Sequence, residues 1–353
     1  MSVLSPRYLL PLSTSCAAMV ALGTGTLAFV QNAGPYTALL CIARIILGVA
    51  TGLSEAVFTA LLIRRFDSSE LQKPISIVMA SKTIASMGGP ALGGAAYDLA
   101  GFSAPFAVGG LLVFCLSVAQ FMIVGNIRDN AQLQKATSIS KVLNVQFLYL
   151  VLNAFLFLAA WFMAEPIVAV WWAQAPYSLS PTAVGLISLF ASIYGAFVLA
   201  AGATIGPHIG AVIMIIFASV LALVTSWVFA PAPFLPFIPR ALWQLCLGVA
   251  GMTTAQNLTL PAIQPLLVKV CERRQLQRDE VAPLVAAANL MAFGMAGAIA
   301  PVLSGSIVDS IRAHAVPGTT DSSIQWLVAT WNTVSFGFLV IFGPIILWDL
   351  HVN

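Results

Sequence analysis

The chain has 353 residues, of which 60% are hydrophobic and only 8% are charged, and its formal net charge is +3. Soluble globular proteins have about 25% charged residues, so this composition excludes an ordinary water-soluble fold and predicts an all-α protein that crosses a membrane several times. The net charge is too small to suggest a nucleic-acid partner, and the five cysteines lack the spacing of a metal site or a disulfide framework.

Apolar runs long enough to cross a bilayer of about 30 Å occur along the whole chain. The alternating pattern of a membrane β-barrel does not occur, so each run indicates a helix. We predict ten transmembrane helices, at residues 9–31, 36–63, 74–97, 103–126, 146–173, 181–205, 207–230, 237–268, 282–308 and 324–348.

The basic residues of the connections gather on one side of the predicted membrane. If Arg7 is cytoplasmic and every helix crosses once, the cytoplasmic segments hold eleven Lys and Arg residues and the opposite segments hold Arg240 and Arg312 alone. This distribution agrees with the positive-inside rule. We therefore expect a multi-pass protein of a plasma, vacuolar or vesicle membrane, with both termini in the cytoplasm.

A polar connection at residues 127–145 divides the chain into a partial helix bundle at 1–126 and a six-helix bundle at 146–353. Two pairs of matching stretches indicate that the bundles are repeats: LGVA at 47–50 recurs at 247–250, and GPALGGAAYD at 89–98 corresponds to APVLSGSIVD at 300–309. The matches pair the second and third predicted helices with the eighth and ninth. The first bundle then lacks the two helices that would precede it.

These stretches resemble motifs of the major facilitator superfamily. ARIILGVATG at 43–52 is similar to the family's fourth-helix motif, and GGPALGG at 88–94 is similar to the fifth-helix motif that is characteristic of antiporters. FSAPF at 102–106 and the Glu-Pro pair of AEPIVAVWW at 164–172 resemble vesicular amine transporters. The resemblance implies a fold of two six-helix bundles, here without helices 1 and 2, and a relative of drug:proton antiporters and vesicular amine transporters.

Glu165 is the first candidate for coupling to protons, because a charge at membrane depth is costly and usually faces a cavity or a partner. It precedes Pro166 in a predicted span, and Trp161, Trp171 and Trp172 are near it in the sequence. It can carry a proton or pair with a cationic substrate, for which the indoles offer cation–π faces. The alternative is a hydrogen-bonded acid that fixes helix packing.

Arg44 and Glu55 share one predicted helix and are eleven residues apart, or about three turns. They therefore face similar directions but are too distant to pair with each other. The resemblance implies that Arg44 contributes to proton coupling, whereas the alternative is a side chain that extends toward the membrane surface. For Glu55 we expect a position that faces the cavity.

Further polar side chains lie within predicted spans, and they either line a substrate path or bond between helices. They are Gln256, Asn257, Gln264 and Asn289. The small residues Gly88, Gly89, Gly93 and Gly94, with Pro90, predict a bent helix that another helix approaches closely.

We therefore predict a secondary transporter, a proton-coupled antiporter that moves a small organic, cationic or drug-like solute by alternating access. Its partners are the solute, protons and the lipid bilayer, and we expect a monomer without a cofactor. A nucleotide-binding loop of the type GxxxxGK[ST] does not occur, and the residues offer no catalytic constellation for an enzyme. The alternative is a truncated, non-transporting membrane protein or a gene-model fragment.

Overall fold

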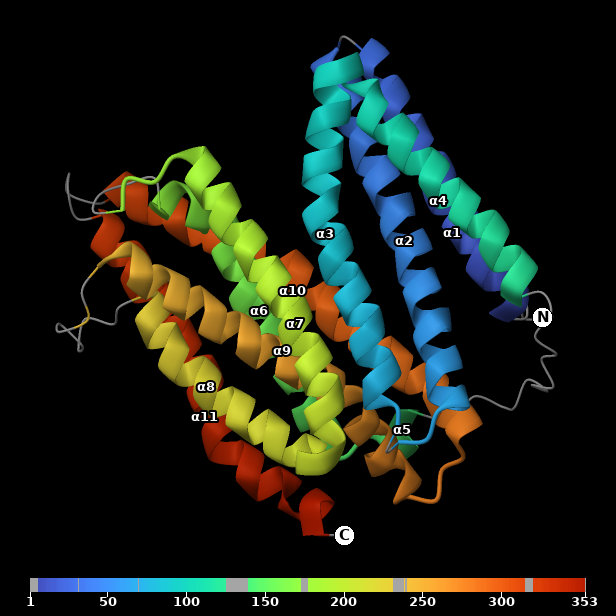
Figure 1. The fold of residues 1–353 in the computed structure, drawn as a ribbon, viewed down its shortest axis with the longest axis vertical. Coiled ribbons are helices and arrows are strands. Elements are labelled where there is room, and N and C mark those ends of the chain that lie inside the picture. Colours follow the sequence, from blue (N-terminus) through green and yellow to red (C-terminus); the bar gives the residue numbers. More distant parts are fainter. Residues whose placement is uncertain are drawn as a thin grey trace. The chain divides into compact units, whose positions relative to one another are not determined.

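The fold is that of a computed structural model, which describes residues 6–30, 32–68, 70–124, 139–172, 177–230, 238, 240–314 and 320–352. Within these ranges every long element is an α-helix (Figure 1). The long helices are α1 Pro6–Gly25, α2 Ala33–Arg65, α3 Gln72–Ala100, α4 Ser103–Val124, α6 Val145–Trp172, α7 Pro181–Ile209, α8 Ala211–Phe229, α9 Leu242–Glu272, α10 Arg278–His314 and α11 Thr320–Val352. Two short elements, η1 Thr26–Phe29 and α5 Ile139–Val142, complete the order.

Each of the ten predicted segments corresponds to one long helix, so the all-helical fold is confirmed. Some helix ends differ from the prediction. The predicted helices 181–205 and 207–230 placed the break at residue 206, but α7 continues through Pro207 and ends at Ile209. The turn is made by Gly210, whose φ of 91° is unfavourable for any residue with a side chain.

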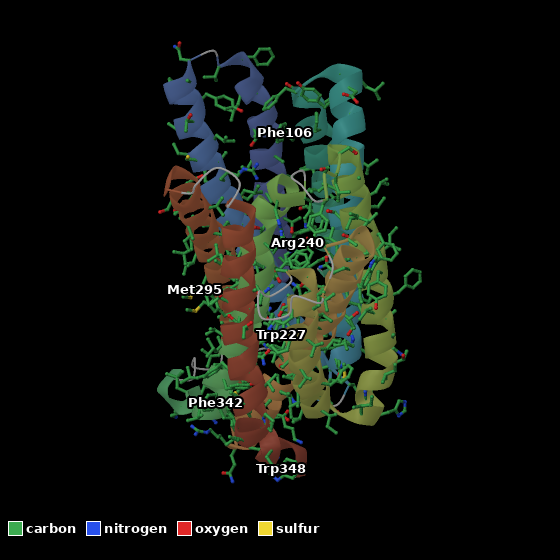
Figure 2. All side chains as sticks on the ribbon, turned by 90° about the vertical axis from the view of Figure 1, so that its left-hand side faces the viewer. Phe106, Trp227, Arg240, Met295, Phe342 and Trp348 are labelled. Carbon is green, nitrogen blue, oxygen red and sulfur yellow. The ribbon has the colours of Figure 1, made fainter. Side chains whose placement is uncertain are left out.

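Large apolar side chains cover the outside of the helices, as contact with lipid requires. Met295, Phe342 and Trp348 are examples, and all three are exposed (Figure 2). Eight helices are long and apolar enough to cross a membrane: α1, α2, α4, α6, α7, α8, α10 and α11. Helix α9 has the length for a crossing and is described along its whole course, but its sequence is too polar to meet the same criterion.

The chain packs as two units. The first consists of residues 1–65, 85–137 and 277–290, and the second of residues 66–84, 138–276 and 291–353. In the first unit α1 packs against α2 and α4, and in the second unit α8, α9 and α11 pack closely together with α6 and α7. The division into bundles at 1–126 and 146–353, with a linker at 127–145, stays a prediction.

Hydrogen bonds made by polar side chains join the three long helices α1, α2 and α4 of the first unit. Thr14 on α1 donates to the Oε1 atom of Gln120 on α4 at 2.9 Å, and the hydroxyls of Ser13 and Ser54 bond at 2.7 Å between α1 and α2. Ser117 on α4 donates to the main-chain oxygen of Pro11 at 2.9 Å. Such bonds hold membrane helices together, because apolar packing gains little where lipid is equally apolar.

Glycines allow the two most closely packed helices of the second unit to touch. A Cβ atom at Gly248 of α9 would lie 2.6 Å from the main-chain nitrogen of Phe229 at the end of α8, closer than real Cβ contacts come. A Cβ atom at Gly251 would lie 2.6 Å from Cβ of Thr225. The backbones of α8 and α9 can be this close only because these positions have no side chains.

We expect Gly248→Ala to lower the free energy of unfolding by about 1–3 kcal/mol, because the added methyl group must separate α8 from α9. Gly185→Ala on α7 is the matched control, since nothing lies within 4 Å of its Cβ position. Thermal unfolding of both purified variants, followed by tryptophan fluorescence, measures the difference. Equal midpoints for the two variants would contradict the close approach.

Candidate functional site

Helix α9 combines a polar sequence with deep burial. Residues 261–268 are all buried, although this half of the helix contains Pro261, Gln264 and Pro265. Proline has no N–H group, so the carbonyl groups of Asn257 and Pro261 lack their usual helical donors. The centre of this membrane-length helix therefore carries polar backbone groups as well as polar side chains.

Three buried side chains of α9 have oxygen atoms without a hydrogen-bond partner in the part of the chain that the structure describes. They are Thr253 Oγ1, Thr259 Oγ1 and Gln264 Oε1, and each residue is at most 7% exposed. A buried polar group without a partner costs about 1–3 kcal/mol. Unsatisfied oxygens at three positions of one helix fit an interior that water or a polar solute enters.

Helices α7 and α9 meet through polar side chains next to these oxygens. The hydroxyl groups of Tyr194 and Thr254 bond at 2.9 Å. A Cβ atom at Gly195 would lie 2.7 Å from Nδ2 of Asn257, so the glycine makes room for this half-buried amide. The predicted lining residue Asn257 therefore lies at the contact between α7 and α9, and its neighbour Gln256 is half-buried on α9.

The three tryptophans of α6 are in different environments. Trp171 and Trp172 are buried, and their rings lie 5.8 and 6.2 Å from the ring of Phe229 at the end of α8. Tyr177 packs on Trp171 at 6.1 Å. Trp161, almost three turns earlier in α6, is 38% exposed. The structure thus joins Trp171 and Trp172 in one aromatic cluster and places Trp161 apart from it.

Several predicted site residues belong to helices whose side chains are not described at those positions. Glu165 lies in α6 between Trp161 and Trp171, but its side chain is outside the described residues. The same holds for Gly88, Gly89, Pro90 and Gly94 of α3. At Gly93, a Cβ atom would lie 4.0 Å from Cβ of Pro105, the distance of an ordinary contact between α3 and α4. The roles predicted for these residues stay predictions.

Arg44, Glu55 and Asn289 lie in the first unit. On α2, Arg44 is exposed and Glu55 is half-buried, and on α10 Asn289 is half-buried. Ser54, which precedes Glu55, bonds to the hydroxyls of Ser13 and Thr14 at 2.7 and 3.2 Å. Glu55 is thus next to the polar contact between α1 and α2.

Sequence analysis missed Thr253, Thr259 and Tyr194 as site candidates. The polar run TTAQNLTLPAIQP within a predicted span was the available signal for the two threonines. Tyr194 gave no such signal, because its role depends on the helix that packs beside it. Among the described residues there is no group of three or more His, Cys, Asp or Glu side chains that could hold a metal ion.

A family model described as Major Facilitator Superfamily matches residues 4–301. No curated protein matches the chain by sequence. Three solved structures with a similar fold are compared. The fucose:proton symporter FucP of E. coli is 12% identical, with 95% of this chain and 84% of that chain covered and a TM-score of 0.68.

The other two structures are equally remote in sequence. The proton:xylose symporter XylE, bound to 6-bromo-6-deoxy-D-glucose, is 13% identical, with coverage of 96% and 80% and a TM-score of 0.65. A bacterial homologue of the iron transporter ferroportin, in an outward-facing state, is 13% identical, with coverage of 95% and 85% and a TM-score of 0.63. At these identities the likeness concerns the fold alone.

If the polar side chains of α9 line a hydrated path, a cysteine at position 256 should react with a charged, membrane-impermeant thiol reagent. The test uses Gln256→Cys in a chain whose five native cysteines are replaced by alanine. Val334→Cys is the control, since Val334 is exposed in the middle of α11, where we expect lipid. Labelling of position 256 but not of 334 fits a hydrated path. An inert cysteine at 256 would show that the polar residues of α9 serve packing.

Proposed function

The chain belongs to the Major Facilitator Superfamily, and from this membership we propose that it is a proton-coupled antiporter of a small organic solute. Members of the family are transporters rather than enzymes, and they bind small-molecule substrates. The chain is a multi-pass integral membrane protein. The class of solute, the coupling to protons and the direction of proton movement are what we propose beyond family membership.

The buried polar side chains of α9 are the observation that carries the proposal. Polar residues at membrane depth are stable only where they face the protein interior or a water-filled cavity. The unpartnered oxygens of Thr253, Thr259 and Gln264, together with the amide of Asn257, are such groups. They offer hydrogen bonds to a solute that leaves water, and this exchange compensates for part of its dehydration.

Coupling to protons rests on Glu165 in this proposal. It lies within α6, which packs against α9 in the second unit, and Pro166 follows it. Glu165 binds a proton in one state and releases it when the solute binds, and the face of Trp161 supports a cationic solute. FucP and XylE, which share the fold, are proton symporters, and this supports our proposal that transport by this chain is coupled to protons.

Antiport, rather than symport, is supported by the resemblance of residues 88–94 to the antiporter motif. We propose that Arg44 adjusts the coupling and that Glu55 and Asn289 face the solute path. The two bundles rock against each other in alternating access. The protein acts as a monomer in a plasma, vacuolar or vesicle membrane, with both termini in the cytoplasm.

We expect Glu165→Gln to reduce solute-driven proton movement to the level of protein-free liposomes, because the amide cannot exchange a proton. The measurement uses proteoliposomes with a trapped pH-sensitive dye and a panel of amines and drugs. Glu70→Gln is the matched control, because Glu70 is exposed in the connection between α2 and α3. The control should retain the wild-type rate.

Two results would contradict this proposal. Undiminished proton movement in Glu165→Gln would remove Glu165 from the coupling. Proton movement in the same direction as the solute would replace antiport by symport.

A further inference from the structure

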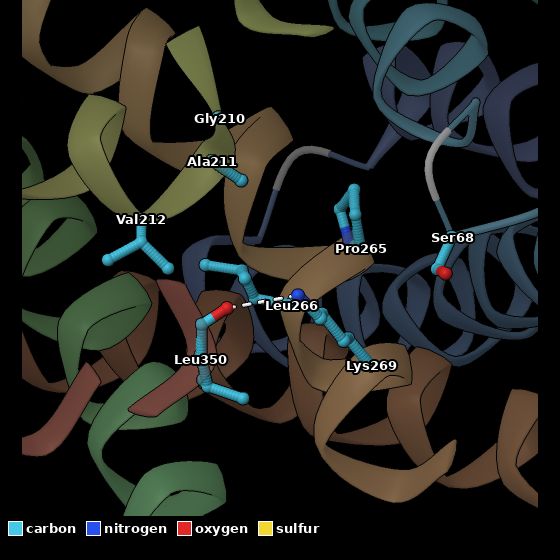
Figure 3. A pocket seen from close by; sticks show the side chains of 8 residues that line it. All are labelled: Ser68, Gly210, Ala211, Val212, Pro265, Leu266, Lys269 and Leu350. Carbon is cyan, nitrogen blue, oxygen red and sulfur yellow. Dashed lines mark hydrogen bonds between the residues drawn. The ribbon is translucent and has the colours of Figure 1, made fainter. Parts of the chain in front are cut away.

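A cavity of about 280 Å³ lies in the second unit, where α8 begins and where α9 and α11 end (Figure 3). Its lining combines groups from four segments of the chain. They are Ser68 from the connection before α3, Gly210, Ala211 and Val212 at the start of α8, Pro265, Leu266 and Lys269 near the end of α9, and Leu350 near the end of α11.

Lys269 gives this cavity a positive charge. Its Nζ atom donates to the main-chain oxygen of Leu350 at 3.0 Å, as the dashed line in Figure 3 marks. An ammonium group has three protons to donate, and this bond uses one of them on a neutral acceptor. Two donors of the ammonium group therefore remain for an anion in the cavity. The Ser68 hydroxyl of the lining is already used, because it donates to Oε2 of Glu272 at 3.1 Å, so one carboxylate also lies beside the cavity.

The first turn of α8 adds further donors to the same cavity. Gly210 begins this helix without a capping side chain, and the first helical bond runs from Met214 N to Gly210 O at 3.1 Å. The N–H groups of Ala211 and Val212 therefore precede the first bonded turn and have no acceptor within the helix. These amides attract a negatively charged ligand, as Lys269 does.

A second cavity, of about 320 Å³, lies between α7, α8 and α9, and its open surface is apolar. It is lined by Gly202, Ile205, Ile209, Ile213 and Phe217 among others. The isoleucines and Phe217 are exposed, so this crevice opens toward the outside of the helices. Ile213 and Met214 line the crevice, whereas Gly210 to Val212 line the cationic cavity. The first turn of α8 thus contributes consecutive residues to the two cavities, first to the cationic cavity and then to the crevice.

We propose that the two cavities together bind one anionic phospholipid. Its phosphate lies beside Lys269 and the amides of α8, and one of its acyl chains fills the apolar crevice. A ligand for this pair of cavities needs an anionic group joined to a hydrocarbon chain, and the surrounding bilayer supplies such molecules. Lys269 belongs to the basic cluster that the positive-inside rule assigns to the cytoplasmic side, where anionic lipids are concentrated.

The test measures lipid retention by the purified full-length protein with native mass spectrometry. The probes are dioleoyl-phosphatidylglycerol and dioleoyl-phosphatidylcholine at equal concentrations. We expect the wild type to retain phosphatidylglycerol preferentially and Lys269→Gln to retain it about fivefold less. Arg273→Gln is the matched control: Arg273 is an exposed cation one turn away that does not line the cavity. It should behave as the wild type.

A second variant tests the crevice. Ala201 is exposed and lines it, so Ala201→Phe should obstruct the acyl chain and reduce retention while Lys269 stays in place. A variant is tested for lipid retention only if its midpoint of thermal unfolding in lipid-free detergent equals that of the wild type.

Three results would overturn the proposal. They are equal retention of the two lipids by the wild type, unchanged retention in Lys269→Gln, and full displacement of phosphatidylglycerol by millimolar inorganic phosphate. The last result would identify a site for free phosphate. None of these measurements depends on transport, so the lipid site and the antiport function fail separately.

Discussion

Polar groups at the depth of the hydrocarbon must find their hydrogen bonds inside the protein, because lipid offers none. This constraint explains why the described spans are helices, in which the backbone satisfies itself. It also explains the side-chain bonds of the first unit, where Thr14 reaches Gln120 and Ser13 reaches Ser54. These side chains have partners on neighbouring helices, so their polarity is used to hold the unit together.

Helix α9 follows the same constraint with a different outcome. Its buried oxygens at Thr253, Thr259 and Gln264 have no partners among the described residues, although the neighbouring Thr254 bonds to Tyr194. A helix that exists only to support the fold gains nothing from such groups. A polar solute could use them, and for this reason we base the functional proposal on α9.

Close packing and open space alternate around α8. At its end, Gly248 of α9 allows contact with the backbone of Phe229, and Gly251 allows contact with the side chain of Thr225. At its beginning, Gly210 turns the chain, and the first turn of α8 contributes residues to the cationic cavity and to the apolar crevice. The tight end fixes the position of the helix, and the open end leaves space that lipid can occupy.

The sequence by itself determined where the helices lie and to which family the chain belongs. Both follow from local features: the length of an apolar run needed to cross a bilayer and short motifs such as ARIILGVATG. It misplaced the break between α7 and α8, predicted at residue 206, because the apolar run continues through both helices and the turn depends on the positive φ of Gly210.

Only the tertiary structure decided which polar side chains are satisfied. Asn257 fits against Gly195, and Trp171 packs on Phe229 while Trp161 does not. These outcomes depend on which helices become neighbours and on their rotation, and the composition of a single helix contains neither. The residues that bond across 106 positions in the first unit, Thr14 and Gln120, show the same limit.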